Sequence, residues 1–406
     1  MAEPWELADA RHCDEVDPLA RFRDRFVFDT DLVAYLDGNS LGRLPKTTAE
    51  RLRRLVETEW GTGLIRSWEA GWVDLPTQVG DRLGEAVLGA AAGQTVIADS
   101  TSVNLYKVLH VACGLQPDRS EIVIDDTNFP TDRFIVESVA AARGRSVRWV
   151  SPDPAAGVTA ADLAPVLGPQ TAVVALNQVD YRSGFRTDLT GLTGLVHEAG
   201  AVVVWDLCHS AGVVPVGLDV AQADFAVGCT YKYLNAGPGA PAFIYAAQRH
   251  HGSMAQPITG WFGARDVFAM APAYEPADGI RRMLSGTPQV SGLVAVDEGV
   301  KLVAEAGIDA IHAKAMALTD MVVDLVDAWL VPLGASLASP RQAARRGGHV
   351  TVRCSDARAT ADRMTAAGVV PDFRNPDLIR LGLSPLTTSY TEAWTGLAVM
   401  RDIIAA

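Results

Sequence analysis

The sequence is poor in cysteine, in positive charge and in long apolar stretches. Its five cysteines are scattered, odd in number and free of metal-ligand spacing, at Cys13, Cys113, Cys208, Cys229 and Cys354. This pattern indicates reduced thiols in a cytoplasmic protein and no metal site. No apolar stretch approaches the ~18 residues of a transmembrane helix, and residues 1–9 are acidic, without the apolar segment of a signal peptide. We therefore expect neither a membrane protein nor a secreted one.

The shortage of positive charge restricts the partners. Lys and Arg number 35 against 48 Asp and Glu, which gives a formal net charge of -13. Nucleic acid and anionic membranes attract basic surfaces, and the densest basic segment, residues 341–346, is short and diluted with alanine. We expect neither as a partner. The composition, 49% hydrophobic and 20% charged, is that of a soluble globular protein, and 406 residues allow two or three domains.

Short β-branched runs alternate with alanine-rich helical stretches over the first two thirds of the chain. The runs predict strands at residues 121–124, 147–150, 172–176, 201–205 and 224–228. Helical patterns precede or separate them at residues 105–112, 133–142, 162–167 and 190–199. Strands separated by helices in this way predict an α/β fold with a mostly parallel central sheet flanked by helices.

The pattern changes from about Ile308 onward. A long amphipathic helix is expected at residues 309–330, followed by a strand, a helix and a strand at residues 348–353, 357–367 and 378–383. This order is typical of a smaller C-terminal α+β domain. We predict an N-terminal arm over residues 1–45 that packs with the small domain, a large domain over residues 46–285, and the small domain over residues 286–406.

Lys232 is the most informative residue. It lies among apolar and small residues in the segment 228–239 (GCTYKYLNAGPG), 26 positions after Asp206, which ends the apolar run 202–206. Pyridoxal phosphate chemistry needs an amine that forms a Schiff base and an anion that keeps the ring nitrogen protonated. Taken alone, Lys232 could also be a surface charge, and Asp206 could cap the turn after its strand.

Other candidates follow strands or begin helices, where ligands of open parallel sheets gather. Thr101 and Ser102 precede a helical run and offer hydroxyls for a phosphate, although a simple helix cap fits them as well. Phe129 and Asp132 lie in a loop after a strand. His209, three residues after Asp206, could equally be an ordinary loop histidine. The combination of these residues in this order favours the cofactor site.

These segments resemble the kynureninases, a family of fold type I pyridoxal phosphate enzymes in the aspartate aminotransferase superfamily. The similarity covers nearly the whole chain. It rests on residues 35–42 (YLDGNSLG), 65–68 (IRSW), 129–132 (FPTD), 206–212 (DLCHSAG), 260–263 (GWFG), 279–288 (GIRRMLSGTP) and 379–382 (IRLG). The pairing of Asp206 with Lys232 marks the superfamily, whereas the NSLG, FPTD and SGTP segments are far more specific.

The resemblance implies pyridoxal 5'-phosphate as cofactor and a role for each matching residue. Lys232 would hold the cofactor and shuttle the α-proton, Asp206 would pair with the ring nitrogen, and Phe129 would stack on the ring with Asp132 nearby. The phosphate would be bound by Thr101, Ser102 and Tyr231, and His209 would belong to the cofactor environment.

The resemblance also implies a homodimer with active sites at the subunit interface. Trp261 and Thr287 match segments that reach the phosphate from the neighbouring subunit. Arg380 matches the residue that grips the substrate carboxylate, for which a planar guanidinium is suited. Asn39 and Ser40 would lie in the loop that closes over the substrate. Trp60 would form a wall for the aromatic end, although a tryptophan of a helix core fits the pattern equally.

The implied reaction is hydrolytic cleavage of the Cβ–Cγ bond of L-kynurenine, giving anthranilate and L-alanine, with Tyr231 as proton relay. Ala264, Thr387 and Asn177-Gln178 depart from the family pattern, so 3-hydroxykynurenine or another ring-substituted kynurenine is an alternative substrate. A related lyase or desulfurase is a second alternative, but Cys354 follows a strand and is expected to be buried. A non-catalytic relative is a third, which the presence of Lys232, Asp206 and Arg380 disfavours.

Overall fold

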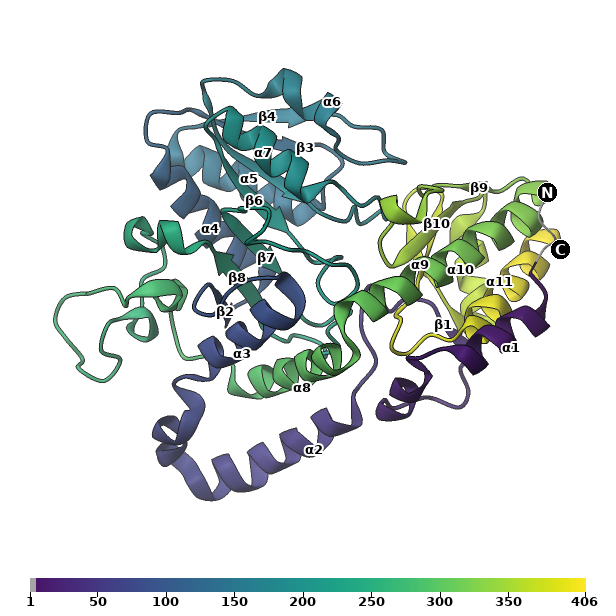
Figure 1. The fold of residues 1–406 in the computed structure, drawn as a ribbon, viewed down its shortest axis with the longest axis horizontal. Coiled ribbons are helices and arrows are strands. Elements are labelled where there is room, and N and C mark those ends of the chain that lie inside the picture. The colour runs from purple at the N-terminus through teal and green to yellow at the C-terminus, as the bar shows by residue number, and fades with distance from the viewer. Residues whose placement is uncertain (1–4) are drawn as a thin grey trace.

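The fold consists of a large and a small sheet with their covering helices, joined through the long helix pair α8 (Val290–Ala306) and α9 (Ile308–Leu325) (Figure 1). A computed structural model describes residues 5–406, so the first four residues of the predicted N-terminal arm lie outside the described part. None of the helices within residues 5–406 has the length and apolarity needed to cross a bilayer.

The large sheet confirms the predicted α/β fold. Its seven strands lie in the order β2 (Thr95–Ala98), β8 (Ala242–Ala246), β7 (Phe225–Gly228), β6 (Val202–Asp206), β5 (Thr171–Asn177), β3 (Glu121–Asp125) and β4 (Ser146–Val150). The strands from β7 to β4 are all parallel, and the five predicted strands match them within a residue or two. Strand β8 is antiparallel to both of its neighbours.

Helices cover both faces of this sheet, which is why its strands are apolar on both sides. The side chains of Val202 and Val204 enter one core with α4 (Thr101–Leu115) and α5 (Pro130–Arg143). Those of Val203 and Trp205 enter the opposite core with α3 (Leu75–Leu83), α7 (Leu189–Glu198) and α8. The short helix α6 (Ala160–Leu163) completes the crossover between β4 and β5.

The small sheet is antiparallel and has the order β12 (Asp372–Arg374), β13 (Leu378–Gly382), β10 (His349–Arg353) and β9 (Ser336–Leu337). It packs with α9, α10 (Ala357–Ala366) and α11 (Tyr390–Ala405) around a separate apolar core. The predicted helix over residues 309–330 is α9 together with a π-helical turn, Val326–Leu330, that continues it. The cysteine in this region, Cys354, is buried, as expected.

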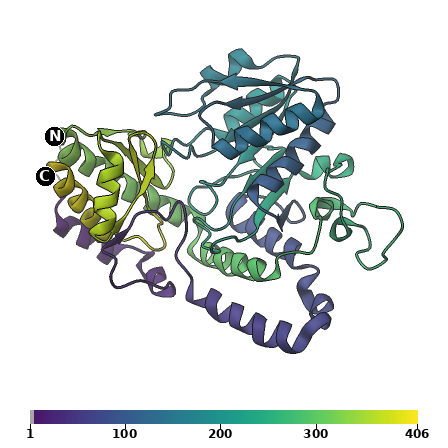
Figure 2. The ribbon, with the colours of Figure 1, turned by 180° about the vertical axis from the view of Figure 1, so that it is seen from behind.

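The N-terminal segment lies against the small sheet. Helix α1 (Leu7–Val16) packs on α11, and β1 (Ala34–Tyr35) pairs in parallel with β11 (Val369–Val370). Helix α2 (Lys46–Arg54) then continues into a π-helical segment, Leu55–Gly63. Seen from the front and from behind, this long helical stretch runs beneath α8, along the edge of the large body (Figures 1 and 2).

The packing of helix α8 shifts the boundary between the large and the small domain. It falls inside the predicted small domain, yet its buried side chains Leu293, Val296 and Val300 lie in the core of the large sheet. We therefore propose a boundary near Gly307, between α8 and α9, in place of residue 285. The limit at residue 45 stays a prediction.

Candidate active site

A cavity opens at the carboxyl ends of the central parallel strands. Its thirteen lining residues include eight of the predicted site residues: Thr101, Ser102, Phe129, Asp132, Asp206, His209, Tyr231 and Lys232. They come together because β5, β6 and β7 end at this edge while α4 and α5 begin there. Loops and helix N-termini meet at this edge in open parallel sheets, which makes it the usual ligand site.

The side chains of Lys232 and His209 are in contact in the cavity. The Lys232 Nζ lies 2.9 Å from Nε2 of His209. Burial is the main cause that holds the pKa of His209 well below its ordinary value, and the charge of Lys232 adds to it. The imidazole is therefore neutral at pH 7 and can accept a hydrogen bond from a protonated lysine amine.

Two carboxyl groups face each other across the end of β6. Asp206 is fixed by the backbone N–H of Cys208, which donates to its Oδ1 over 2.7 Å. Asp132, in the first turn of α5, is buried, and burial together with the neighbouring charge of Asp206 raises its pKa well above the ordinary value. The raised pKa favours the protonated form of Asp132, in which it donates a hydrogen bond to Asp206. In that form the pair presents a single negative charge to the cavity.

The amino end of α4 forms another wall. Ser100 is the N-cap residue of α4, and its side chain accepts a hydrogen bond from the backbone N–H of Val103 over 3.5 Å. Thr101 and Ser102 are not needed as caps, and both line the cavity. A 15-residue helix offers free N–H groups and the positive end of its dipole at this point. This wall suits an anionic group such as a phosphate.

Phe129 supplies an aromatic face. Its side chain is 37% exposed, and its ring makes an edge contact with Tyr181 at 5.2 Å between centroids. Its backbone N–H donates to Oδ1 of Asn128 over 2.7 Å, and Asn128 in turn donates to Asp125 at the end of β3 over 2.8 Å. The loop is thus held so that a planar ring can stack on Phe129.

Tyr231 joins the lysine loop to the N-terminal segment. The backbone N–H of Gly42 donates to the Tyr231 carbonyl over 2.8 Å. Burial, with the neighbouring Cys229 thiol as the next cause, raises the pKa of the Tyr231 phenol. The phenol remains protonated at neutral pH and can donate a hydrogen bond or a proton.

Arg380, Asn39 and Ser40 form a second group beside the cavity. The buried guanidinium of Arg380 donates to the carbonyl of Tyr181 and to Oγ of Ser40, the latter over 3.0 Å, and is ion-paired with Asp372. With its amide oriented to satisfy both neighbours, Asn39 accepts from Nε of Arg380 over 3.3 Å. Four of the five guanidinium N–H groups are therefore engaged. Tyr181 links this group to the cavity, because its side chain lines it.

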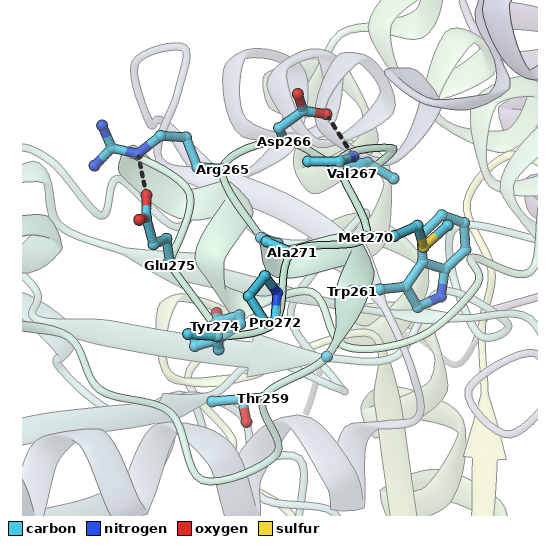
Figure 3. Close-up of a pocket in the computed structure, with 14 residues that line it drawn as sticks. Thr259, Trp261, Arg265, Asp266, Val267, Met270, Ala271, Pro272, Tyr274 and Glu275 are labelled. Carbon is cyan, nitrogen blue, oxygen red and sulfur yellow. Dashed lines mark hydrogen bonds and ion pairs between the residues drawn. The ribbon is translucent and has the colours of Figure 1, made fainter.

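Three predicted residues lie elsewhere in the single chain. Trp60 is 62% exposed on the π-helical segment after α2, so the alternative of a helix-core tryptophan is wrong. Thr287 is exposed. Trp261 lies beside Met270 in a segment that protrudes from the large body (Figures 1 and 3), where the Tyr274 hydroxyl donates to the Gly263 carbonyl over 3.1 Å. The predicted roles of Trp261 and Thr287 across a subunit interface stay a prediction.

The cavity also contains residues that the sequence analysis did not propose for the site. Asn177, Val179 and Tyr181 line it after β5, and Thr131 and Cys208 complete the wall. Asn177 ends a strand next to β6 and stands opposite Asp206. The position of this segment after an apolar run was a usable signal, since residues there reach the same edge of the sheet as Asp206.

Solved structures define the class of fold. The chain is similar to the apo cysteine desulfurase of Thermococcus onnurineus, with a TM-score of 0.83 and 17% identity over 95% of this chain and 98% of that one. It is also similar to C-DES with glycine covalently linked to its PLP cofactor, with a TM-score of 0.82 and 20% identity over 94% of this chain and 99% of that one. The fold is that of the fold type I PLP-dependent enzymes.

Curated relatives identify the family within this class. The chain is 40% identical to the kynureninase of Pseudomonas fluorescens over 404 residues, which cover 98% of this chain and 95% of the relative. It is 41% identical to that of Burkholderia pseudomallei strain K96243 over 403 residues, with the same coverage. Residues 311–400 match the model of the kynureninase C-terminal domain. The chain belongs to the kynureninase family.

Proposed function

We propose that this chain is a PLP-dependent hydrolase that converts L-kynurenine and water to anthranilate and L-alanine. The observation that carries the proposal is the amine of Lys232 inside a cavity with the Asp206–Asp132 pair, in a chain with 40% identity to a kynureninase. A 3-hydroxykynurenine, which would give 3-hydroxyanthranilate, is the alternative substrate, since Asn177 and its neighbours vary from the family pattern at the cavity wall.

The cavity residues fit the cofactor. Thr101 and Ser102 would hold its phosphate at the amino end of α4, Phe129 would stack on its ring, and Asp206 would pair with the ring nitrogen. The single negative charge of the carboxyl pair matches one protonated pyridinium. When bound, PLP supplies an electron sink for charge that develops at the α-carbon of an amino acid.

The chain's own groups then handle protons. Lys232 takes and returns the proton at the substrate α-carbon, with the neutral His209 2.9 Å away to accept a hydrogen bond from its amine. Tyr231, whose phenol stays protonated, donates a proton near the departing carbon. Water adds to the γ-carbonyl carbon, a C–O bond forms, the Cβ–Cγ bond breaks, and the β-carbon receives a proton to give alanine.

Arg380 would bind the substrate carboxylate. One of its N–H groups is free, and the neutral hydroxyl of Ser40 is the weakest of its present acceptors, because the others include a carboxylate and two amide carbonyls. A substrate carboxylate that replaces Ser40 would thus gain two N–H donors from one plane. Ser40 and Asn39 would then close over the bound amino acid.

The experiment is a substrate panel with purified, PLP-supplied protein. We expect anthranilate, measured by its fluorescence, and alanine to form in equal amounts from kynurenine. Lys232→Ala should abolish both products, whereas Lys301→Ala, which removes a half-exposed lysine of α8 outside the site, should not. Turnover of 3-hydroxykynurenine alone would select the alternative. Release of alanine from cysteine or selenocysteine without cleavage of any kynurenine would refute the proposal.

We also propose that the protein is a homodimer of the cytoplasm. Five unpaired thiols fit a reducing compartment. The protruding segment exposes apolar side chains: Met270, which lies beside Trp261 in Figure 3, is 73% exposed, and Phe268, whose ring centroid is 6.4 Å from that of Trp261, is 53% exposed. Exposed apolar groups of this size favour an interface. Light scattering should give twice the chain mass, and Phe268→Asp with Met270→Asp should yield a monomer with weakened cofactor binding; a wild-type monomer with full activity would contradict the dimer.

A further inference from the structure

A second buried histidine, His349, lies behind His209 and has no part in the site described above. It begins β10, stands opposite Gly382 of β13 and is fully buried. Its ring centroid lies 5.5 Å from that of His209, with the ring planes at 59°. The backbone of Gly184 closes over it, since a Cβ placed on Gly184 would come within 3.2 Å of His349 Nε2. His349 thus reaches from the small sheet to the back of the cavity.

Partnerless polar atoms gather at this point. Within residues 5–406, neither ring nitrogen of His349 has a hydrogen-bond partner, and Nδ1 of His209 has none. A buried polar atom left unpaired costs ~1–3 kcal/mol. Several such atoms in one place indicate that they share a small polar partner.

Burial, together with the neighbouring positive charges, keeps both imidazole rings neutral. Burial first, and then the charges of Arg380, Lys232 and Arg374, hold the pKa of His349 well below its ordinary value. His209 is neutral for similar reasons. A neutral imidazole has one donor nitrogen and one acceptor nitrogen. Since a protonated Lys232 amine can only donate, His209 accepts with Nε2, 2.9 Å away, and carries its proton on Nδ1.

We propose that His349 is a positioning residue for Lys232 that acts through His209. It accepts the Nδ1–H of His209 through one bound water molecule and so keeps Nε2 of His209 turned toward the lysine amine. The inference rests on the proposed function only in taking Lys232 as the reactive amine.

The test uses the full chain with ¹⁵N-labelled histidine before and after PLP is added. Nitrogen shifts report which ring nitrogen of His209 carries the proton. Before PLP, we expect Nδ1–H in the wild type and in His349→Gln, whose side-chain carbonyl also accepts, and a shift toward Nε2–H in His349→Leu. The dissociation constant of PLP, read from its visible absorbance, should rise about tenfold or more in His349→Leu and little in His349→Gln. His110→Leu is the control, because His110 is a buried histidine of α4 held by Arg143 outside the cavity.

Three results would overturn the inference: Nε2–H on His209 in the wild type, an unchanged His209 in a folded His349→Leu variant, or equal loss in the Gln and Leu variants. If His349→Leu does not fold, a loss of Nδ1–H on His209 or of PLP affinity in His349→Gln would still overturn the inference. The nitrogen shifts need no substrate, so they stand even if kynurenine is not cleaved. Normal kynurenine cleavage with unchanged shifts in every variant would reject the inference and leave the proposed function intact.

Discussion

Replacing Arg380 by lysine should separate substrate binding from cofactor binding. Arg380 is buried and holds Ser40, Asn39, Asp372 and the Tyr181 carbonyl with four of its N–H groups. Lysine keeps the positive charge but has one ammonium on a flexible stem. It cannot offer two parallel N–H groups to a carboxylate while it also contacts Asp372.

The expected loss follows from the number of hydrogen bonds. A bound carboxylate that receives two charge-assisted hydrogen bonds from Arg380 would keep one from lysine. One such bond is worth ~1.5–3 kcal/mol, which corresponds to a drop in kcat/KM of ~10- to 150-fold. Most of the drop should appear in KM, because the carboxylate is gripped equally in the bound substrate and in the transition state.

The assay is steady-state anthranilate formation from kynurenine, together with the visible absorbance of bound PLP. The absorbance of Arg380→Lys should match the wild type, since Arg380 does not line the cofactor cavity. Arg374→Lys is the matched control, because Arg374 pairs with the same Asp372 at 2.8 Å but is partly exposed. A kcat/KM for Arg380→Lys within threefold of the wild type, or an equal fall in both variants, would refute the assignment of the carboxylate to Arg380.

Three further predictions concern the packing and charge around the site. Gly42→Ala should abolish PLP binding, measured by absorbance, because its Cβ would lie 2.3 Å from the Lys232 carbonyl oxygen. Asp37→Asn should raise the free energy of unfolding, measured in urea at pH 7, by about 1–3 kcal/mol. Burial raises the pKa of Asp37 to about 6. The wild type therefore loses stability as the pH rises from about 4 to 6, and the asparagine variant does not. Asp224→Asn should lower the free energy of unfolding by ~3 kcal/mol at pH 7. Burial alone would raise the pKa of Asp224, but its hydrogen bonds, led by that from His250, lower it. The stability that Asp224 contributes is therefore lost as the pH falls below about 4.

Each of these variants has a control or a contrary result. Gly114→Ala adds a Cβ in open space and should leave PLP binding unchanged. Equal stability of Asp37→Asn and the wild type at pH 7, or a difference that persists below pH 4, would contradict the argument for Asp37. Asp118→Asn changes an exposed carboxylate and should have little effect at any pH. A cost for Asp224→Asn that stays constant down to pH 2 would show that its charge is not the stabilising feature.

The parallel part of the large sheet could be predicted because its strands are apolar runs separated by helical patterns. Strands β2 and β8 were not predicted. No helix separates β7 from β8, since residues 229–241 form the lysine loop, so the chain returns antiparallel without the β-α-β signal. Helix α8 shows the same limit: its apolar face predicts burial, but periodicity does not say which core it enters.

The residues proposed to bind the cofactor could be predicted from their positions at strand ends, whereas those proposed to bind the substrate could not. Asp206 and Lys232 follow neighbouring apolar runs, so the rule for strand ends brings them together. Ser40 and Arg380 are 340 positions apart, and no spacing predicts their hydrogen bond; the family resemblance implied a substrate-binding role for each of them, but not this contact. His349 was not predicted, because a single histidine at the start of a strand belongs to no local motif. Only the structure shows that its unpaired ring nitrogens lie beside His209.

The two sides of the site also come from different parts of the fold. The cavity residues Thr101, Phe129, Asp206 and Lys232 belong to the large sheet and its helices, whereas Arg380 belongs to the small sheet. A shift of the small sheet would therefore move Arg380 and His349 together relative to Lys232, and leave Thr101 at the amino end of α4 in place. With the roles proposed for Arg380 and His349, substrate binding and the orientation of His209 are coupled through the same four strands.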